Sequence, residues 1–258
     1  MSDGRQYIRI GVSVSVHDTA AAGSSHARFY KMIAIQPPAY FPSLAHTALL
    51  QHVEHFILAD TFPYRRKTFQ NRSKLRNAPG GHWIRIPVFG RPEGAPIHTV
   101  DIETGGRWRE KHWRSFKYDY RSTMYFEYFA ERFRTFYAQE WTELANCTCR
   151  SVELQAELFG LSTALSRASM LDGAPNTYAG IAAAVEGDVL VVPEEGTVDG
   201  SDVDRSRVEV QSFAYDHPTY RQNFEGFEPG MTALDLAFNY GREAVRILAG
   251  GVRTANTS

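Results

Sequence analysis

Two polar side chains, Gln36 and Asp60, each stand where a short apolar run of the sequence ends, in IAIQ and in FILAD. The segment PPAYFP that follows Gln36 contains three prolines, and these stop both a helix and a central strand. If the two runs are neighbouring parallel strands, both side chains lie at one edge of the sheet, where open α/β sheets bind ligands. The spacing therefore predicts an amide and a carboxylate beside one crevice, with Tyr40 in the turn. The alternative is that Gln36 and Tyr40 only satisfy backbone groups of that turn.

Histidines and cysteines offer few metal ligands. His46, His52 and His55 lie on or beside the next segment, and the last two are three residues apart, as zinc ligands on one helix face can be. Hydrogen-bonded or solvent-facing histidines are the more frequent outcome, and we favour it. Cys147 and Cys149 are close neighbours, and no second thiol pair completes a zinc site around them. We therefore expect no metal, and free thiols in a reducing cytoplasm.

The segments that would position these residues alternate between strands and helices. Residues 31–35 and 56–60 are apolar runs typical of buried strands, and residues 43–55 between them have apolar side chains at helical spacing. A strand, a helix and a strand in succession predict a parallel sheet. The predicted fold is α/β, with a central mostly parallel sheet, flanking helices and an aromatic-rich helical segment. We expect further strands over 82–88, 97–102, 163–169, 189–193 and 207–213, helices over 108–145, 151–159, 176–185 and 231–248, and a hairpin turn over 79–81.

The first thirty residues differ from the rest of the chain. Residues 7–16 alternate in the manner of a strand, and a stretch of small side chains typical of a loop follows them. We therefore expect residues 1–30 to be an N-terminal extension with an extra strand and a linker. A single α/β domain is predicted over 31–250, and two lobes over 31–150 and 151–250 are the alternative division.

The bulk composition excludes several classes of protein. The chain has 258 residues, 43% of them hydrophobic and 22% charged, which is ordinary for a globular protein. Its net charge of −1 offers no basic surplus for a nucleic-acid backbone, so we expect no DNA partner. No run reaches the roughly 18 apolar residues that cross a bilayer, and the N-terminus lacks the shape of a signal peptide. We expect a cytoplasmic protein without membrane insertion, and a homo-oligomer stays open.

Several motifs resemble, in their order along the chain, those of the WbqC-like protein family. They are IAIQPPAYFP, the strand that ends in Asp60, FQNR (69–72), HWIRIPV (82–88), WREKHW (108–113) and YDHPTYRQNFEGFEPGMTALDLAFNYG (215–241). The resemblance covers residues 31–247 and points to O-antigen and other polysaccharide biosynthesis. It implies N-acyl or aminoacyl transfer of the glycyl type, which forms an amide on a small amine or an amino sugar. Where the family carries a Gly-rich turn, this chain reads VVPEEGTVDG (191–200), which leaves room for a small amine of secondary metabolism as the substrate.

The resemblance implies roles for side chains in these motifs. Making an amide from an activated acyl donor requires a base for the amine, donors for the developing oxyanion, and groups that position both partners. His217 and His112 are the expected bases. Asp60 would orient one of them or bind the ammonium form of the amine. The expected substrate-binding residues are Gln36, Tyr40, Asn71, Arg72, Lys111, Asp235 and Asn239, of which Arg72 and Lys111 suit a phosphate or carboxylate on the donor.

No cofactor is expected, because the implied acyl donor is itself activated. That donor is a carrier-protein thioester or an aminoacyl-tRNA, so an acyl or peptidyl carrier protein is a candidate partner beside the amine substrate. Several of these side chains also have a purely structural alternative. Asp235 and Asn239 are helix neighbours that could pair locally, and His217 could close a turn before Pro218.

Two other functions stay open. The stretch from PAYFP to FILAD is faintly similar to nucleotidylyltransferases with a His-x-Gly-His motif, where a strand also feeds a turn and a histidine-started helix. Here the first histidine is missing and Ala45 replaces the glycine. A nucleotidylyltransferase-like or ATP-dependent adenylating enzyme is therefore the first alternative, and a non-catalytic small-molecule binding module is the second.

Overall fold

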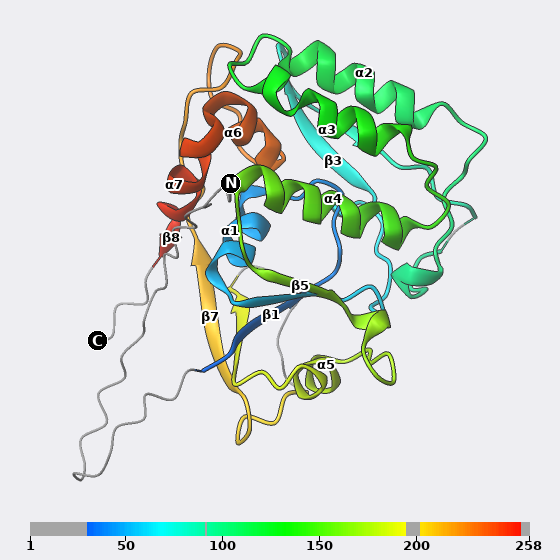
Figure 1. Cartoon of the computed structure of the whole chain (residues 1–258), viewed down its shortest axis with the longest axis vertical. Helices are drawn as coiled ribbons and strands as arrows, with labels where there is room; N and C mark the ends of the chain where they lie inside the picture. Colours follow the sequence, from blue (N-terminus) through cyan, green and yellow to red (C-terminus); the bar gives the residue numbers. More distant parts are fainter. Residues whose placement is uncertain (1–29, 91, 195–201, 254–258) are drawn as a thin grey trace, which may run out of the picture.

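The computed structural model describes residues 30–90, 92–194 and 202–253 (Figure 1). The predicted N-terminal strand over 7–16 lies outside these residues. Six strands form the central sheet in the order β5-β2-β1-β6-β7-β8, and every neighbouring pair is parallel except β7 and β8. The strands are β1 (Met32–Gln36), β2 (His55–Leu58), β5 (Ala164–Arg167), β6 (Val189–Pro193), β7 (Glu209–Tyr215) and β8 (Val252–Arg253). This order is that of a doubly wound sheet whose switch point lies between β1 and β6, and it confirms the predicted α/β fold.

Helices cover both faces of this sheet, as parallel strands require. Along β1, Ala34 faces α1 (Leu44–His52) and α7 (Ala244–Ala249), whereas its two isoleucine neighbours face α5 (Tyr178–Ala184). The alternation follows from the two-residue period of a strand. In Figure 1, α1 lies above the sheet and α5 lies below it.

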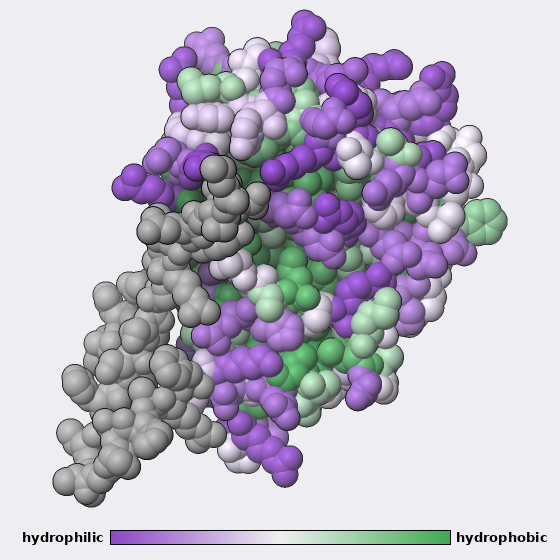
Figure 2. Space-filling view, viewed as in Figure 1, coloured by the Kyte–Doolittle hydropathy of each residue, from purple (hydrophilic) through white to green (hydrophobic). Residues whose placement is uncertain are grey.

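A second layer packs on the helices above the sheet and holds most of the buried aromatic residues. Its elements are the hairpin of β3 (Arg72–Asn77) and β4 (Gly80–Arg85), and the helices α2 (Trp108–Tyr120), α3 (Phe126–Ala138), α4 (Leu144–Phe159) and α6 (Ala233–Tyr240). Phe41 from the turn after β1 enters this cluster and contacts Phe116 and Phe133, with ring centroids 5.7 and 5.5 Å apart. Helix α4 contributes to this cluster and to the core above the sheet, so it joins the two layers. Hydrophilic side chains cover the outer surface over α2 and α3 (Figure 2).

Three predicted elements differ from the structure. The helical segment 108–145 is broken twice, and its first break follows Tyr120, whose carbonyl accepts a hydrogen bond from the Thr123 hydroxyl at 2.7 Å. The predicted last helix is interrupted at Gly241, which has a φ of 56°. The chain continues from there as the 3-10 helix η3 (Gly241–Glu243) and then as α7. The predicted strand 97–102 contains a 3-10 turn, η1 (Ile97–Thr99). The residues on either side of this turn form only isolated β-bridges, such as that between Val88 and Ile102, and no continuous strand pairing. None of the helices within the described ranges has the length and apolar character that a bilayer crossing requires.

Candidate functional site

Gln36 and Asp60 lie at the same edge of the sheet. Gln36 pairs with Leu58 in the parallel register, and its carbonyl accepts a hydrogen bond from the Ala59 amide at 2.8 Å. The Gln36 side-chain nitrogen and both ring nitrogens of His46 are buried without a hydrogen-bond partner among the described residues. This edge lies beside the switch point, so polar groups there face the region where doubly wound sheets bind ligands.

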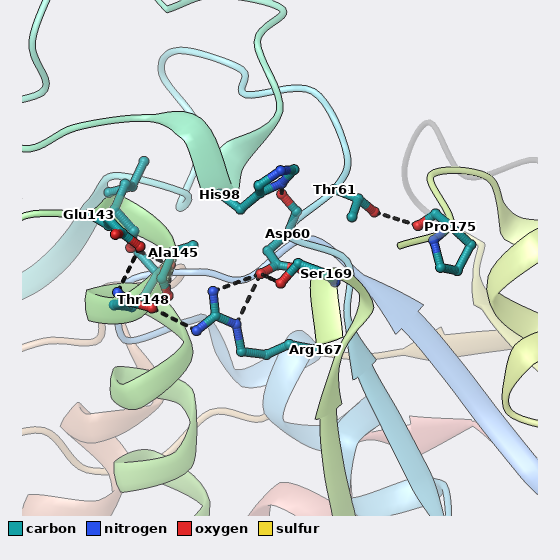
Figure 3. A network of polar contacts seen from close by, with 11 residues as sticks. Asp60, Thr61, His98, Glu143, Ala145, Thr148, Arg167, Ser169 and Pro175 are labelled. Carbon is teal, nitrogen blue, oxygen red and sulfur yellow. Dashed lines mark hydrogen bonds and ion pairs between the residues drawn. The ribbon is translucent and has the colours of Figure 1, made fainter. Parts of the chain in front are cut away.

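Asp60 is the centre of a buried network at the carboxyl ends of β2 and β5 (Figure 3). Its Oδ1 accepts from the Ser169 amide at 2.8 Å, and its Oδ2 accepts from the Ser169 hydroxyl at 2.6 Å and from Arg167 Nε at 2.9 Å. Arg167 Nη1 donates in turn to Asn146 Oδ1 on α4 at 2.6 Å. Ser169 lies on η2 (Ala168–Met170) directly after β5. Because both carboxylate oxygens already accept from the chain, Asp60 ties β2, β5 and α4 together.

His112 is part of a second buried network, in the aromatic layer. Its Nδ1 accepts from the Tyr40 hydroxyl at 3.0 Å, and its Nε2 donates to the Arg85 carbonyl at 3.1 Å. The Tyr40 hydroxyl also contacts that of Tyr137 at 2.5 Å. Burial lowers the pKa of His112 to about 4, so its ring is neutral near pH 7. Both ring nitrogens are used within the protein, and His112 joins α2 to the end of β4.

A cavity of about 610 Å³ opens beside the β3–β4 hairpin, and we call it the basic pocket. Its polar lining consists of Tyr64, Arg66, Lys67, Asn71, Arg72 and Arg85, with Glu103 as the carboxylate at its wall. Of the ten predicted site residues, Asn71 and Arg72 line this pocket. Tyr64, Arg66 and Arg85 were not predicted. The stretch YRRKTFQNR that precedes β3 carried the compositional signal for two of them.

Four further predicted residues lie elsewhere. His217 is exposed, with Nδ1 donating to the Pro218 carbonyl at 3.0 Å and Nε2 accepting from the Gly230 amide at 3.3 Å. Lys111 is exposed on α2. Asn239 donates from Nδ2 to the carbonyl of Asp235, one turn earlier on α6, at 2.7 Å. The structure thus does not gather the ten residues in one cavity, because separate elements hold them at the sheet edge, in the aromatic layer, at the basic pocket and beside α6.

Asp235 is fully buried and holds the loop before α6. Its Oδ2 accepts from the Tyr220 hydroxyl at 2.9 Å and from Gln222 Nε2 at 3.0 Å. Burial, only partly offset by these hydrogen bonds, raises the pKa of Asp235 to about 6. The folded chain therefore keeps the proton of this carboxyl at pH values where the unfolded chain has lost it.

Stability should accordingly fall as the pH rises through this window. The protonated Asp235 contributes its full share to the free energy of unfolding below the unfolded pKa of about 4. This share, roughly 2–3 kcal/mol, is lost as the pH rises from 4 through 6. Urea unfolding at pH 4 and at pH 7 tests this, with Asp235→Asn as the uncharged comparison. The free energy of unfolding of the wild type should fall relative to that of the variant by this amount. An equal difference between the two proteins at both pH values would show that Asp235 does not titrate in this range.

The candidate metal ligands do not come together. His55 Nε2 lies 2.7 Å from the Ser166 hydroxyl, whereas the His52 ring lies tilted against that of Phe213, with centroids 5.2 Å apart. Cys147 and Cys149 are buried free thiols, and burial raises the pKa of both. No group of three or more His, Cys, Asp or Glu side chains with metal-binding geometry occurs in the part of the chain that the structure describes.

Comparison with known proteins gives two matches in sequence. A model of the WbqC-like protein family matches residues 36–247. A protein of Mycobacterium tuberculosis that carries the name uncharacterized protein Rv1507c is 29% identical over 222 residues, which are 83% of this chain and 96% of that protein. No solved structure matches.

Proposed function

Because the chain belongs to the WbqC-like protein family, we propose that it is a transferase that forms an amide by N-acyl or glycyl-type aminoacyl transfer to a small amine or an amino sugar. The observation that carries this proposal is the basic pocket. Two residues of the family-like FQNR motif, Asn71 and Arg72, line it together with further cations. A pocket of this kind suits an activated donor that carries an anionic group.

The lining of the pocket also offers groups for the transfer itself. In the reaction, the amine nitrogen attacks the carbonyl carbon, and the bond between this carbon and the sulfur or oxygen of the donor breaks. Tyr64 is a buried phenol that can donate to the oxyanion, since burial raises its pKa and keeps it protonated. Glu103 is the carboxylate at the wall that would take the proton from the amine and pass it to the leaving group. This assignment replaces His112, whose nitrogens are engaged.

Mass spectrometry of amide products tests the proposal. The full chain would be incubated with amino sugars and small amines and with a glycyl-loaded carrier protein or glycyl-tRNA. We expect a product whose formation falls by about 100-fold or more in Glu103→Gln, as is typical for loss of a general base. Arg114→Gln, on the exposed face of α2, is the matched control and should retain the wild-type rate.

Two outcomes would contradict this assignment. Full turnover by Glu103→Gln would remove the pocket carboxylate from the reaction. A folded but inactive His217→Ala protein would place the base on the surface loop before α6, as the sequence motif implied. If no amine is acylated from either donor while a donor analogue still binds, the chain is a binding module.

Nucleotidyl transfer is the second candidate, and the sheet order favours it. The strand order places a switch point beside the turn after β1, which is where doubly wound sheets bind nucleotides. His46 lies there, with its ring 5.0 Å from that of Phe56, and burial lowers its pKa to about 4. This function requires ATP or CTP binding that depends on Mg²⁺ and is lost in His46→Ala. Acyl transfer predicts a reaction that is indifferent to Mg²⁺.

A further inference from the structure

We propose that the basic pocket binds a phosphate or diphosphate group in its fully ionised form, through Tyr64, Arg66, Arg72 and Arg85. The pocket is lined by four cationic side chains, those of Arg66, Lys67, Arg72 and Arg85, and by one carboxylate, Glu103. A second carboxylate, Glu93, lies close by, where its Oε2 accepts from the Arg66 amide. No ion pair within the described ranges neutralises the side chains of Arg66, Lys67 or Arg85. A carboxylate ligand would offset one of these charges, whereas a doubly or triply charged phosphate group matches the excess.

The register of the hairpin brings two of these cations face to face. Arg72 on β3 pairs directly with Arg85 on β4, so their side chains lie on the same face of the hairpin. Like charges that stand directly opposite each other destabilise a strand pair. A bound anion between them removes this repulsion, and the pairing is therefore the arrangement expected of an anion site.

The phenol of Tyr64 lies among the same cations. Its side chain is buried, and burial raises the pKa of Tyr64, with Glu93 adding to the rise and the guanidinium groups of Arg66, Arg85 and Arg72 opposing it. Tyr64 and these three arginines line the same pocket. The hydroxyl therefore stays protonated near pH 7 and can donate a hydrogen bond to a phosphate oxygen.

One of the donors, Arg72, is held in place by the protein itself. The guanidinium of Arg72 lies over the Trp83 ring at 3.9 Å and donates from Nη2 to the Lys67 carbonyl, and its Nε is buried without a partner among the described residues. Lys67 has a φ of 61°, which is rare for a side chain other than glycine and marks a loop held by its surroundings. Such pre-organisation lowers the entropy that binding loses.

Hydrogen bonds between side chains and the backbone hold the same loop on both sides. Gln70 Oε1 accepts from the Arg65 amide at 2.7 Å, and Glu93 Oε2 accepts from the Arg66 amide at 2.9 Å. Asn71 Nδ2 donates to the Ile86 carbonyl at 3.1 Å and joins the start of β3 to the segment after β4. The pocket is thus built on a braced loop and the end of a hairpin.

The pH dependence of binding separates a phosphate from a carboxylate. The second ionisation of a phosphate monoester has a pKa of about 6, so affinity should rise between pH 5 and pH 7.5 if the dianion is bound. The other titratable groups that face the site are Tyr64, Glu93 and Glu103. Ionisation of either carboxyl would weaken anion binding as the pH rises, which is the opposite trend.

Isothermal titration of the full chain with inorganic phosphate and with pyrophosphate, at constant ionic strength, tests the inference, with acetate as the carboxylate probe. We expect pyrophosphate to bind more tightly than phosphate, and acetate to bind least. Arg85→Gln and Tyr64→Phe should each weaken pyrophosphate binding by about tenfold or more, since each removes a hydrogen bond to a charged ligand. Arg114→Gln should bind as the wild type does. Thermal melting of each variant checks that it is folded.

Acetate binding as tight as pyrophosphate binding, or an Arg85→Gln variant that binds pyrophosphate unchanged, would overturn the inference. The inference deepens the proposed function, because it gives the donor or the acceptor a phosphate, but its test needs no turnover. Pyrophosphate binding without any amide product would therefore retain the phosphate site and reject the transferase. An amide product whose formation pyrophosphate does not inhibit would retain the transferase and reject the phosphate site.

Discussion

Replacement of Asp60 by alanine is expected to lower the free energy of unfolding by about 3–5 kcal/mol, the usual cost of removing one partner from a buried ion pair. Asp60 has no exposed surface, and its carboxylate accepts from Arg167 and from both the amide and the hydroxyl of Ser169. The substitution leaves the guanidinium of Arg167, which is 20% exposed, without its main counter-charge. It also frees two donors of η2. Urea unfolding at pH 7 measures the loss.

A double-mutant cycle separates the ion pair from the rest of the network. If the pair is strongly coupled, Asp60→Ala combined with Arg167→Ala should cost clearly less than the sum of the two single changes. The surface pair of Arg134 and Glu131 on α3 is the matched control, since its side chains are 65% and 72% exposed. Glu131→Ala should cost less than about 1 kcal/mol. An Asp60→Ala variant as stable as Glu131→Ala would show that the buried network contributes nothing to stability.

The part of this site that is local in sequence could be predicted. The prolines after Gln36 and the apolar runs on either side of α1 require a strand, a turn and a parallel return, and these bring Gln36 and Asp60 to one edge. The partner of Asp60 could not be found in this way. Arg167 lies 107 residues further along the chain, and it meets Asp60 only because β5 adds to the sheet beside β2.

The position of His112 was available from the helical period. Trp108, His112, Phe116 and Tyr120 are each four residues apart and are all buried, so they form the inner face of α2. A histidine on that stripe belongs to the core unless a cavity reaches it. The motif WREKHW favoured a catalytic role, and the periodicity favoured the buried role that the structure has.

Arg85 also had a signal in the sequence. The predicted turn over 79–81 closes a hairpin, and with the observed turn between Asn77 and Gly80 the register places Arg72 opposite Arg85. The predicted turn lies one residue from the observed one, and this error was enough to lose the pairing of Arg72 with Arg85. A shift of one residue in the register of a strand moves each of its side chains to the opposite face of the hairpin. Tyr64 lies in the polar and basic stretch YRRKTFQNR, but nothing in the local pattern of that stretch places its phenol beside the hairpin.

Acid should destabilise the protein through His112. The pKa of a histidine in the unfolded chain is about 6.5, and burial lowers that of His112 to about 4 in the folded chain. The stability that the neutral ring contributes is therefore present above pH 6.5 and is lost as the pH falls through 4, a loss of about 3 kcal/mol. His46, with a pKa lowered to about 4 by burial, adds a loss of the same sign.

Urea unfolding of the wild type and of His112→Gln at pH 7 and pH 4 isolates this contribution. The variant should be less stable at pH 7, because it loses the hydrogen bonds to Tyr40 and to the Arg85 carbonyl, but it should lose about 3 kcal/mol less than the wild type on acidification. His217→Gln, at an exposed histidine, should follow the wild type. The contribution of Asp235 to the free energy of unfolding rises as the pH falls over the same range. The comparison is therefore clearest in an Asp235→Asn background, which removes this opposing contribution. An equal loss in the free energy of unfolding for His112→Gln and for the wild type would mean that His112 takes up a proton within the folded protein. The hydrogen bonds of its ring to Tyr40 and to the Arg85 carbonyl would then have to rearrange at acid pH.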